Sequence, residues 1–108
     1  MQKIKVLVAG ATGYIGTQLV KHLIQHKNVI ISYLCGKSSA GKKLSQFDKY
    51  FKYKKIPIIK KFDKSFLNNV DVIFTALPNG DAQKISKYLK NSNRLIDLSA
   101  DFRIENPH

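Results

Sequence analysis

Apolar residues occur along the chain in short runs, separated by stretches rich in glycine, serine, asparagine and lysine. Residues 3–9 (KIKVLVA) have almost no polar interruption after Lys5, which is typical of a strand that is buried on both faces. Further strands are predicted at residues 29–34, 56–60, 70–77 and 95–98. The run at 56–60 is expected at an edge of the sheet, because Pro57 has no N–H to donate.

Two helices are predicted between these strands. Ile15, Leu19 and Leu23 recur four residues apart, and polar side chains take the other face, so an amphipathic helix is predicted from about residue 13 to residue 26. A second helix is predicted from a repeat of apolar residues with three lysines turned away from it: Ala82, Ile85 and Leu89, with Lys84, Lys87 and Lys90.

Less regular segments complete the pattern. Residues 63–68 are predicted to form a helical turn, and residues 35–55 a loop with at most one short helix. Strands that alternate with helices predict an α/β fold, a Rossmann-type doubly wound and mainly parallel sheet with helices on both faces. All 108 residues are expected to form one domain.

The composition is that of an ordinary globular protein, with 44% hydrophobic and 24% charged residues. No apolar run approaches the ~20 residues that a membrane span needs, so we expect no membrane partner. Cys35 is the only cysteine, which excludes an internal disulfide and fits a reducing cytoplasm.

The net charge of +12 raises the question of a nucleic-acid partner. Ten lysines lie between Lys37 and Lys64 against two acids, and Tyr50, Phe51 and Tyr53 are interleaved with them. Such a segment can bind a phosphate backbone. However, lysine is abundant along the whole chain and only two residues are arginine, the side chain that direct base readout favours. We therefore expect no nucleic-acid partner.

Three glycines follow the first predicted strand at intervals of three, in Gly10-Ala11-Thr12-Gly13-Tyr14-Ile15-Gly16. Between a buried strand and an amphipathic helix, this spacing is typical of a dinucleotide site. Gly10 allows a tight turn, Gly13 lets the backbone approach a pyrophosphate, and Gly16 lets the helix pack against the strand. The phosphates then meet free N–H groups at the positive end of the helix dipole.

The end of the second predicted strand indicates which dinucleotide is bound. NAD sites usually place Asp or Glu there to bind the ribose 2′-hydroxyl, whereas this chain reads Leu34-Cys35-Gly36-Lys37-Ser38-Ser39. An ammonium group and hydroxyls suit a 2′-phosphate, which a carboxylate would repel. The sequence therefore favours NADP (NADPH).

Four motifs follow one another along the chain: GATGYIG at 10–16, KSSAGKKL at 37–44, ALPNG at 76–80 and DLSADFR at 97–103. Together and in this order they resemble the N-acetyl-γ-glutamyl-phosphate reductases. The resemblance covers essentially the whole chain and implies NADPH-dependent reduction of an acyl phosphate to an aldehyde in arginine biosynthesis. Its coenzyme positions fall on Gly10, Ala11, Thr12, Gly13, Tyr14, Ile15, Gly16, Lys37, Ser38, Ala76, Leu77 and Pro78. Asn79 stands where histidine is frequent in the family.

Ser99, Asp101 and Arg103 follow the last predicted strand, at the edge where the coenzyme is expected. Arginine binds phosphate oxygens in a bidentate manner, so Ser99 and Arg103 are predicted to contact the acyl-phosphate substrate. The resemblance also implies a catalytic cysteine and histidine in a second domain. No residue of this chain is expected to be catalytic: Cys35 is predicted at the adenosine end of the site. The chain is thus expected to be the NADP-binding part of a homo-oligomeric enzyme, inactive alone.

Two other interpretations remain open. An extended short-chain dehydrogenase or epimerase also carries GATGYIG, and Tyr50 and Lys54 have the Tyr-x-x-x-Lys spacing of that class, although far too early in the chain. The second alternative is a non-catalytic basic module that senses a dinucleotide or binds nucleic acid. Salt-dependent binding to DNA would distinguish that module from an NADPH-binding domain.

Overall fold

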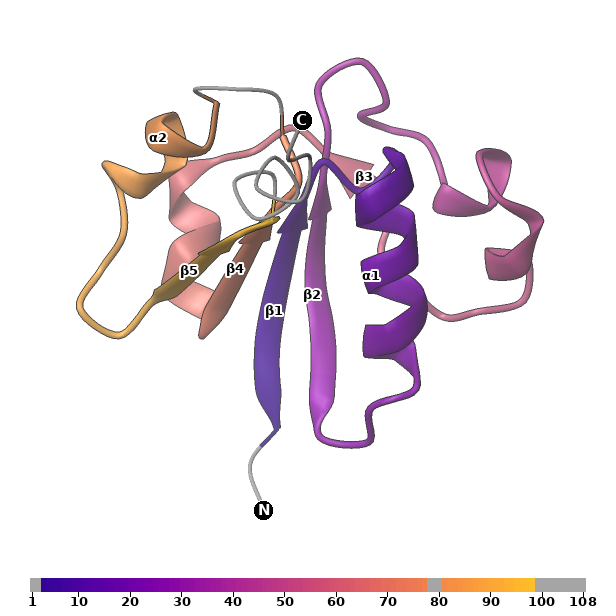
Figure 1. Ribbon diagram of the computed structural model, residues 1–108, viewed down its shortest axis with the longest axis horizontal. Coiled ribbons are helices and arrows are strands. Elements are labelled where there is room, and N and C mark those ends of the chain that lie inside the picture. Colours follow the sequence, from indigo (N-terminus) through magenta and orange to yellow (C-terminus); the bar gives the residue numbers. More distant parts are fainter. Residues whose placement is uncertain (1–2, 78–80, 99–108) are drawn as a thin grey trace, which may run out of the picture.

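A computed structural model describes residues 3–77 and 81–98. Its centre is a five-stranded parallel sheet in the order β3-β2-β1-β4-β5 (Figure 1). The strands are β1 (Ile4–Ala9), β2 (Val29–Cys35), β3 (Ile59–Lys60), β4 (Val72–Thr75) and β5 (Arg94–Asp97). The chain runs outward from β1 to β3, then returns to the other side of β1 with β4. This reversal creates a switch point at the carboxyl ends of β1 and β4, where ligands bind in open α/β sheets.

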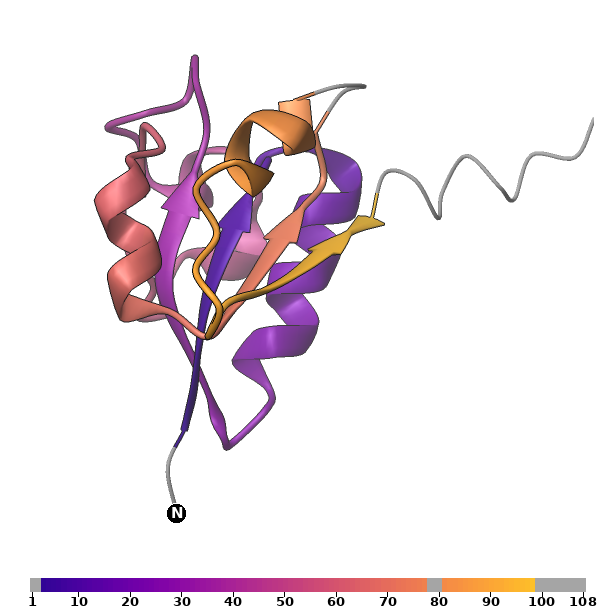
Figure 2. The same cartoon turned by 90° about the vertical axis from the view of Figure 1, so that its left-hand side faces the viewer.

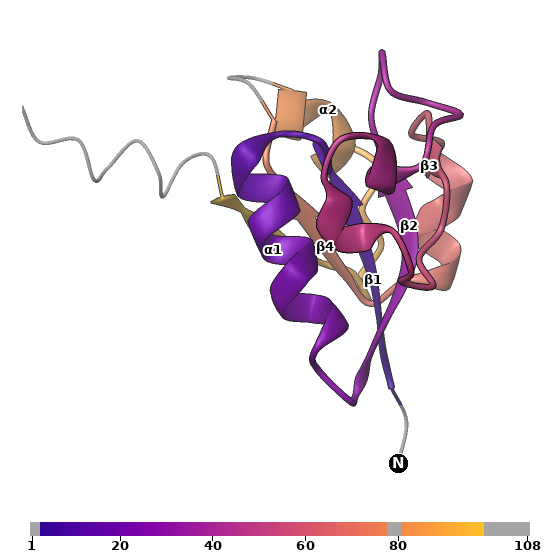
Figure 3. The same cartoon turned by 90° about the vertical axis from the view of Figure 1, so that its right-hand side faces the viewer.

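Helices cover both faces of the sheet, as predicted (Figures 2 and 3). One face is covered by α1 (Tyr14–Ile24) and two 3₁₀ turns, η1 (Leu44–Gln46) and η2 (Lys49–Phe51). The other face is covered by the 3₁₀ helix η3 (Lys64–Asn69) and by α2 (Asp81–Ser86). No helix among the described residues is long and apolar enough to cross a membrane.

Strand β1 separates two hydrophobic cores and is buried on both faces. Val6 and Val8 pack toward α1, in a cluster that includes Val20, Leu34, Leu44 and Phe51. Leu7 and Ala9 point to the opposite face, in a cluster that includes Leu67, Ile73 and Ile85. Alternate side chains of a strand enter opposite layers, so an uninterrupted apolar run is what this central position requires.

Several elements are shorter than the sequence predicted. The strand expected at 70–77 is regular only over Val72–Thr75, because Val70 still caps η3. The second helix ends at Ser86 and not near Leu89, where the N–H of Leu89 bonds the Ser86 carbonyl in the tighter i→i−3 pattern. The edge strand is confirmed but has only two residues, and the loop at 35–55 holds two 3₁₀ turns instead of one helix.

Candidate functional site

The carboxyl ends of β1, β2 and β4 meet at the switch point and are tied together through their backbones. The N–H of Gly10 donates to the Cys35 carbonyl at 2.9 Å, and the N–H of Ala76 donates to the Ala9 carbonyl at 2.9 Å. The residues that directly follow these three strands are therefore held side by side at the end of the sheet (Figure 1).

Two of the three glycines are required by this close packing of backbones. Gly10 has a φ of +84°, and a Cβ there would overlap the carbonyl oxygen of Ala76. Gly16 lies in the first turn of α1, and its Cβ would overlap the carbonyl oxygen of Gly10. The helix can start directly above β1 only because neither residue has a side chain.

Gly13 differs from both, because no contact with residues 3–77 or 81–98 requires it to be glycine. Its φ of −73° and ψ of 168° suit any residue, and a Cβ would lie 3.7 Å from the nearest atom, the Gly10 oxygen. Gly13 is the N-cap of α1, no side-chain cap is formed, and the first turn contains no acid. The first N–H groups of α1 therefore remain available to an anion.

A cleft of about 560 Å³ opens above this loop, and we call it the glycine-loop cleft. Its lining residues are Gly10, Thr12, Gly13, Ile15, Gly36, Lys37, Ser38, Ser39, Ala76, Leu77 and Asp81. Eight of the positions predicted from the sequence are thus brought together from three loops. Ala11 and Gly16 are buried beneath the cleft, and the side chain of Tyr14 is exposed outside it. Pro78, Asn79, Ser99, Asp101 and Arg103 lie outside the described residues.

A family model described as the NAD-binding domain of semialdehyde dehydrogenase matches residues 5–107. The chain belongs to this family. A protein from Ehrlichia canis named N-acetyl-γ-glutamyl-phosphate reductase is 43% identical over 106 residues, 97% of this chain and 31% of that protein. A protein of the same name from Ruegeria pomeroyi is 33% identical over 103 residues, 95% of this chain and 30% of that protein.

A solved structure agrees with the family assignment. The crystal structure of aspartate semialdehyde dehydrogenase with NADP from Candida albicans matches with a TM-score of 0.71 and 25% identity, over 96% of this chain and 32% of that one. The chain spans about a third of the length of the proteins it matches. The family and its Rossmann-type fold therefore confirm the resemblance noted in the sequence.

A smaller apolar pocket of about 150 Å³ lies beside the cleft in this semialdehyde dehydrogenase-type domain, and we call it the Cys35 pocket. It is lined by Ala9, Cys35, Gly36, Lys37, Phe62, Leu77, Asp81, Lys84 and Ile85. Burial raises the pKa of the Cys35 thiol to about 12, although the positive charge of Lys60 opposes the shift. The thiol is therefore protonated at neutral pH, and a protonated thiol is a poor nucleophile.

Three charged side chains lie where the two hollows adjoin. The Nζ of Lys37 is 3.9 Å from one Asp81 oxygen, and the Nζ of Lys84 is 3.6 Å from the other. Asp81 and Lys84 were not predicted as site residues, and Lys84 was expected to point away. The one signal in the sequence is their spacing of three residues, which places opposite charges side by side on a helix.

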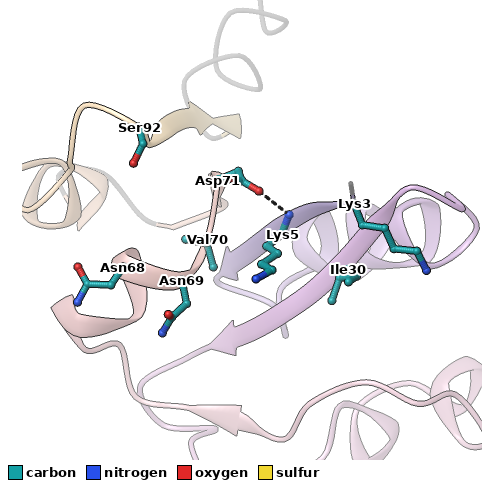
Figure 4. Close-up of a pocket in the computed structure, with 8 residues that line it drawn as sticks. All are labelled: Lys3, Lys5, Ile30, Asn68, Asn69, Val70, Asp71 and Ser92. Atoms are coloured by element: carbon teal, nitrogen blue, oxygen red, sulfur yellow. Dashed lines mark hydrogen bonds between the residues drawn. The ribbon is translucent and has the colours of Figure 1, made fainter. Parts of the chain in front are cut away.

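Another hollow, of about 640 Å³, lies at the opposite, amino ends of the strands (Figure 4). It is lined by Lys3, Lys5, Ile30, Asn68, Asn69, Val70, Asp71 and Ser92. There the N–H of Lys5 donates to an Asp71 carboxylate oxygen at 2.9 Å, and the N–H of Asp71 donates to the Lys5 carbonyl at 2.8 Å. These bonds fix the start of β4 against β1. Because ligands of open α/β sheets bind beyond the carboxyl ends, this hollow is not the candidate site.

The Tyr-x-x-x-Lys pair lies away from the glycine-loop cleft. The Lys54 ammonium is 5.0 Å from the centre of the Tyr50 ring, and neither residue lines the cleft. Lys21 lies 5.2 Å from the same ring, and Lys52 lies 5.6 Å from the ring of Tyr53. The pair thus forms cation–π contacts on the outer surface of η2, which argues against the short-chain dehydrogenase alternative.

Proposed function

We propose that this chain is the coenzyme-binding part of an N-acetyl-γ-glutamyl-phosphate reductase, which uses NADPH to reduce the acyl phosphate to the semialdehyde in arginine biosynthesis. The names of the Ehrlichia and Ruegeria relatives support this reaction, as does the DLSADFR motif. A cytoplasmic location and a homo-oligomeric whole protein belong to the same proposal.

One observation carries the coenzyme-binding part of the proposal: the uncapped start of α1 at Gly13. The two other glycines of the loop are explained by internal packing, whereas Gly13 lines the glycine-loop cleft at the start of α1, where no side chain caps the first N–H groups. A pyrophosphate needs this arrangement, since its charge is matched by the helix dipole and its oxygens by N–H donors. Thr12 and Ile15 line the same space.

The remaining cleft residues fit the two ends of a dinucleotide. Lys37 and Ser38 offer an ammonium and a hydroxyl group at the end of β2, the position for the adenosine ribose. No acid follows β2 directly, so a 2′-phosphate meets no carboxylate on that loop. Ala76 and Leu77 offer apolar surface and backbone beside the glycine loop, where the nicotinamide end lies in our proposal.

The bound coenzyme supplies the hydride, and this chain's residues bind and orient it. Ser99 and Arg103 are proposed to hold the acyl phosphate, because an arginine fork matches phosphate oxygens. The thioester-forming thiolate comes from outside these 108 residues, since Cys35 is the only cysteine here, is buried and has a pKa of about 12. Alone, the chain is expected to bind NADPH and to produce no aldehyde.

Titration of the purified chain with NADPH, followed by the change in nicotinamide fluorescence, tests this proposal. We expect saturable binding of NADPH, and we expect that a DNA column at the same ionic strength does not retain the chain. Absence of saturable binding at millimolar NADPH refutes the coenzyme site. Aldehyde formation by this chain alone refutes the assignment of the catalytic groups to another part of the protein.

A further inference from the structure

Lys37, Asp81 and Lys84 form a charged group between the two hollows, and the proposed coenzyme site assigns a role only to Lys37. Lys37 comes from the loop after β2, whereas Asp81 and Lys84 come from α2. Asp81 is the only acid that lines either the glycine-loop cleft or the Cys35 pocket in the described part of the chain. Each of its two carboxylate oxygens faces a different ammonium group.

The three side chains differ sharply in exposure. That of Asp81 is 24% exposed, whereas those of Lys37 and Lys84 are 78% and 69% exposed. The carboxylate is therefore held against the protein, and the two ammonium groups are free to turn toward a ligand. Separations of 3.6 and 3.9 Å between a partly buried carboxylate and two exposed ammonium groups give weak ion pairs, so the lysines lose little when they leave Asp81.

We propose that Lys84 is a second cationic residue for the ribose 2′-phosphate, and that Asp81 opposes the phosphate and so limits the discrimination between NADP(H) and NAD(H). This inference rests on the proposed coenzyme site. Two ammonium groups and one carboxylate give the group a net charge of +1, while a phosphate monoester carries about −1.5 to −2 at pH 7. The preference for NADPH over NADH then depends on attraction of the 2′-phosphate by the two lysines and on its repulsion by Asp81. Removal of a lysine charge lowers the preference, and removal of the Asp81 charge raises it.

Both directions follow from Coulomb's law. Loss of the Lys84 charge lowers the net charge of the group to zero, and loss of the Asp81 charge raises it to +2. Two unit charges about 4 Å apart change an affinity by about fivefold in water and by more at a protein surface, so one unit charge among these largely solvated groups is expected to change the affinity for the phosphate by about tenfold. Because the nicotinamide, pyrophosphate and adenine are shared by both coenzymes, the effect of the charge on these groups cancels in the ratio of the two dissociation constants, and this ratio reports the effect on the 2′-phosphate.

The experiment measures the dissociation constants of NADPH and NADH for the 108-residue chain by fluorescence titration at low ionic strength. The variants are Lys84→Gln, Asp81→Asn and, as a matched control, Lys87→Gln, an exposed lysine of the same segment that lines neither hollow. Thermal unfolding confirms that each variant is folded. We expect the NADH-to-NADPH ratio of dissociation constants to fall about tenfold in Lys84→Gln, to rise about tenfold in Asp81→Asn, and to stay constant in Lys87→Gln.

Two results overturn the inference while the coenzyme site stands: a ratio that Lys84→Gln leaves unchanged, or one that Asp81→Asn lowers. The latter would mean that Asp81 positions the lysines and does not repel the phosphate. If the wild-type chain binds neither coenzyme, the proposed function fails, and this inference fails with it.

Discussion

Replacement of Gly13 by aspartate is expected to separate folding from coenzyme binding. The backbone at Gly13 has the extended φ and ψ that helix N-caps adopt, and its Cβ would make an ordinary contact 3.7 Å from the Gly10 oxygen. Gly13→Asp therefore introduces no strain. Its carboxylate can accept from the N–H groups of the first turn of α1, which no side chain caps in the wild-type chain.

The stability gain has three sources of similar size. Aspartate is a better N-cap than glycine by a few tenths of a kcal/mol. A negative charge at the N-terminus of a helix adds about 0.3–1 kcal/mol. Replacement of glycine also reduces the entropy of the unfolded chain, which is worth about 0.4–1 kcal/mol at a position without strain. A net gain of about 1 kcal/mol raises the Tm of a domain of this size by about 4–8 °C.

Binding is expected to change in the opposite direction, because the new carboxylate occupies the place of the pyrophosphate. Two like charges about 4 Å apart repel each other by about 1 kcal/mol in water and about 4 kcal/mol at a protein surface. The NADPH dissociation constant of Gly13→Asp should therefore rise by about 5- to 900-fold.

Thermal unfolding by circular dichroism and NADPH titration of the same samples measure both effects. Asn28→Asp is the matched control, since it adds the same charge at an exposed position before β2, at the other end of the sheet. It should leave NADPH binding unchanged. Wild-type affinity in Gly13→Asp would refute the placement of the phosphates at the start of α1, and a lower Tm would refute its assignment as an open N-cap.

Three further predictions concern stability and reactivity. Asn93→Ala should destabilise the chain by about 2–3 kcal/mol in urea unfolding, because the Asn93 amide donates to the carbonyl oxygens of Leu67 and Val70, at 3.1 and 2.9 Å, and both would lose that donor. Cys35 should react with iodoacetamide at pH 8 only after unfolding, because its thiol is buried and burial raises its pKa to about 12. Rapid modification of the folded chain would contradict this burial. The N–H of Tyr50, and then Lys21, hold the pKa of Asp48 below its usual 3.8. The ionised Asp48 carboxylate therefore stabilises the fold fully above about pH 5, and this stabilisation is lost as the pH falls through and below 3.8. Asp48→Asn should therefore reduce the fall in Tm between about pH 5 and about pH 2.5.

The features that the sequence predicted well depend on local patterns. The apolar run of β1 placed alternate side chains in two cores, and the repeat of Leu19 and Leu23 marked α1. The helical turn predicted at residues 63–68 begins with Asp63, and the Asp63 carboxylate accepts from the N–H of Ser65 at the start of η3. Such signals require no knowledge of distant segments, because periodicity and capping act within a few residues.

The features that the sequence did not predict depend on which segments become neighbours. Lys84 was expected in solvent because it lies opposite Ala82 and Ile85, and it is indeed exposed. Its role depends on the loop after β2, more than forty residues earlier, which the strand order brings beside the first residue of α2. An exposed lysine in a lysine-rich chain has no local pattern that separates a binding group from a solvated one.

The same distinction between local packing and ligand binding applies within the glycine motif. Gly10 must be glycine because the backbone of Ala76 contacts it, and Gly16 must be glycine because the backbone of Gly10 contacts it. The spacing of these two glycines therefore indicates the fold, whether or not a ligand is bound. Gly13 makes no such close backbone contact within the described part of the chain, and it borders the cleft, so its lack of a side chain leaves room for a ligand. The outer glycines, Gly10 and Gly16, therefore indicate a Rossmann-type crossover. Within the motif, only the middle glycine, Gly13, indicates a bound diphosphate.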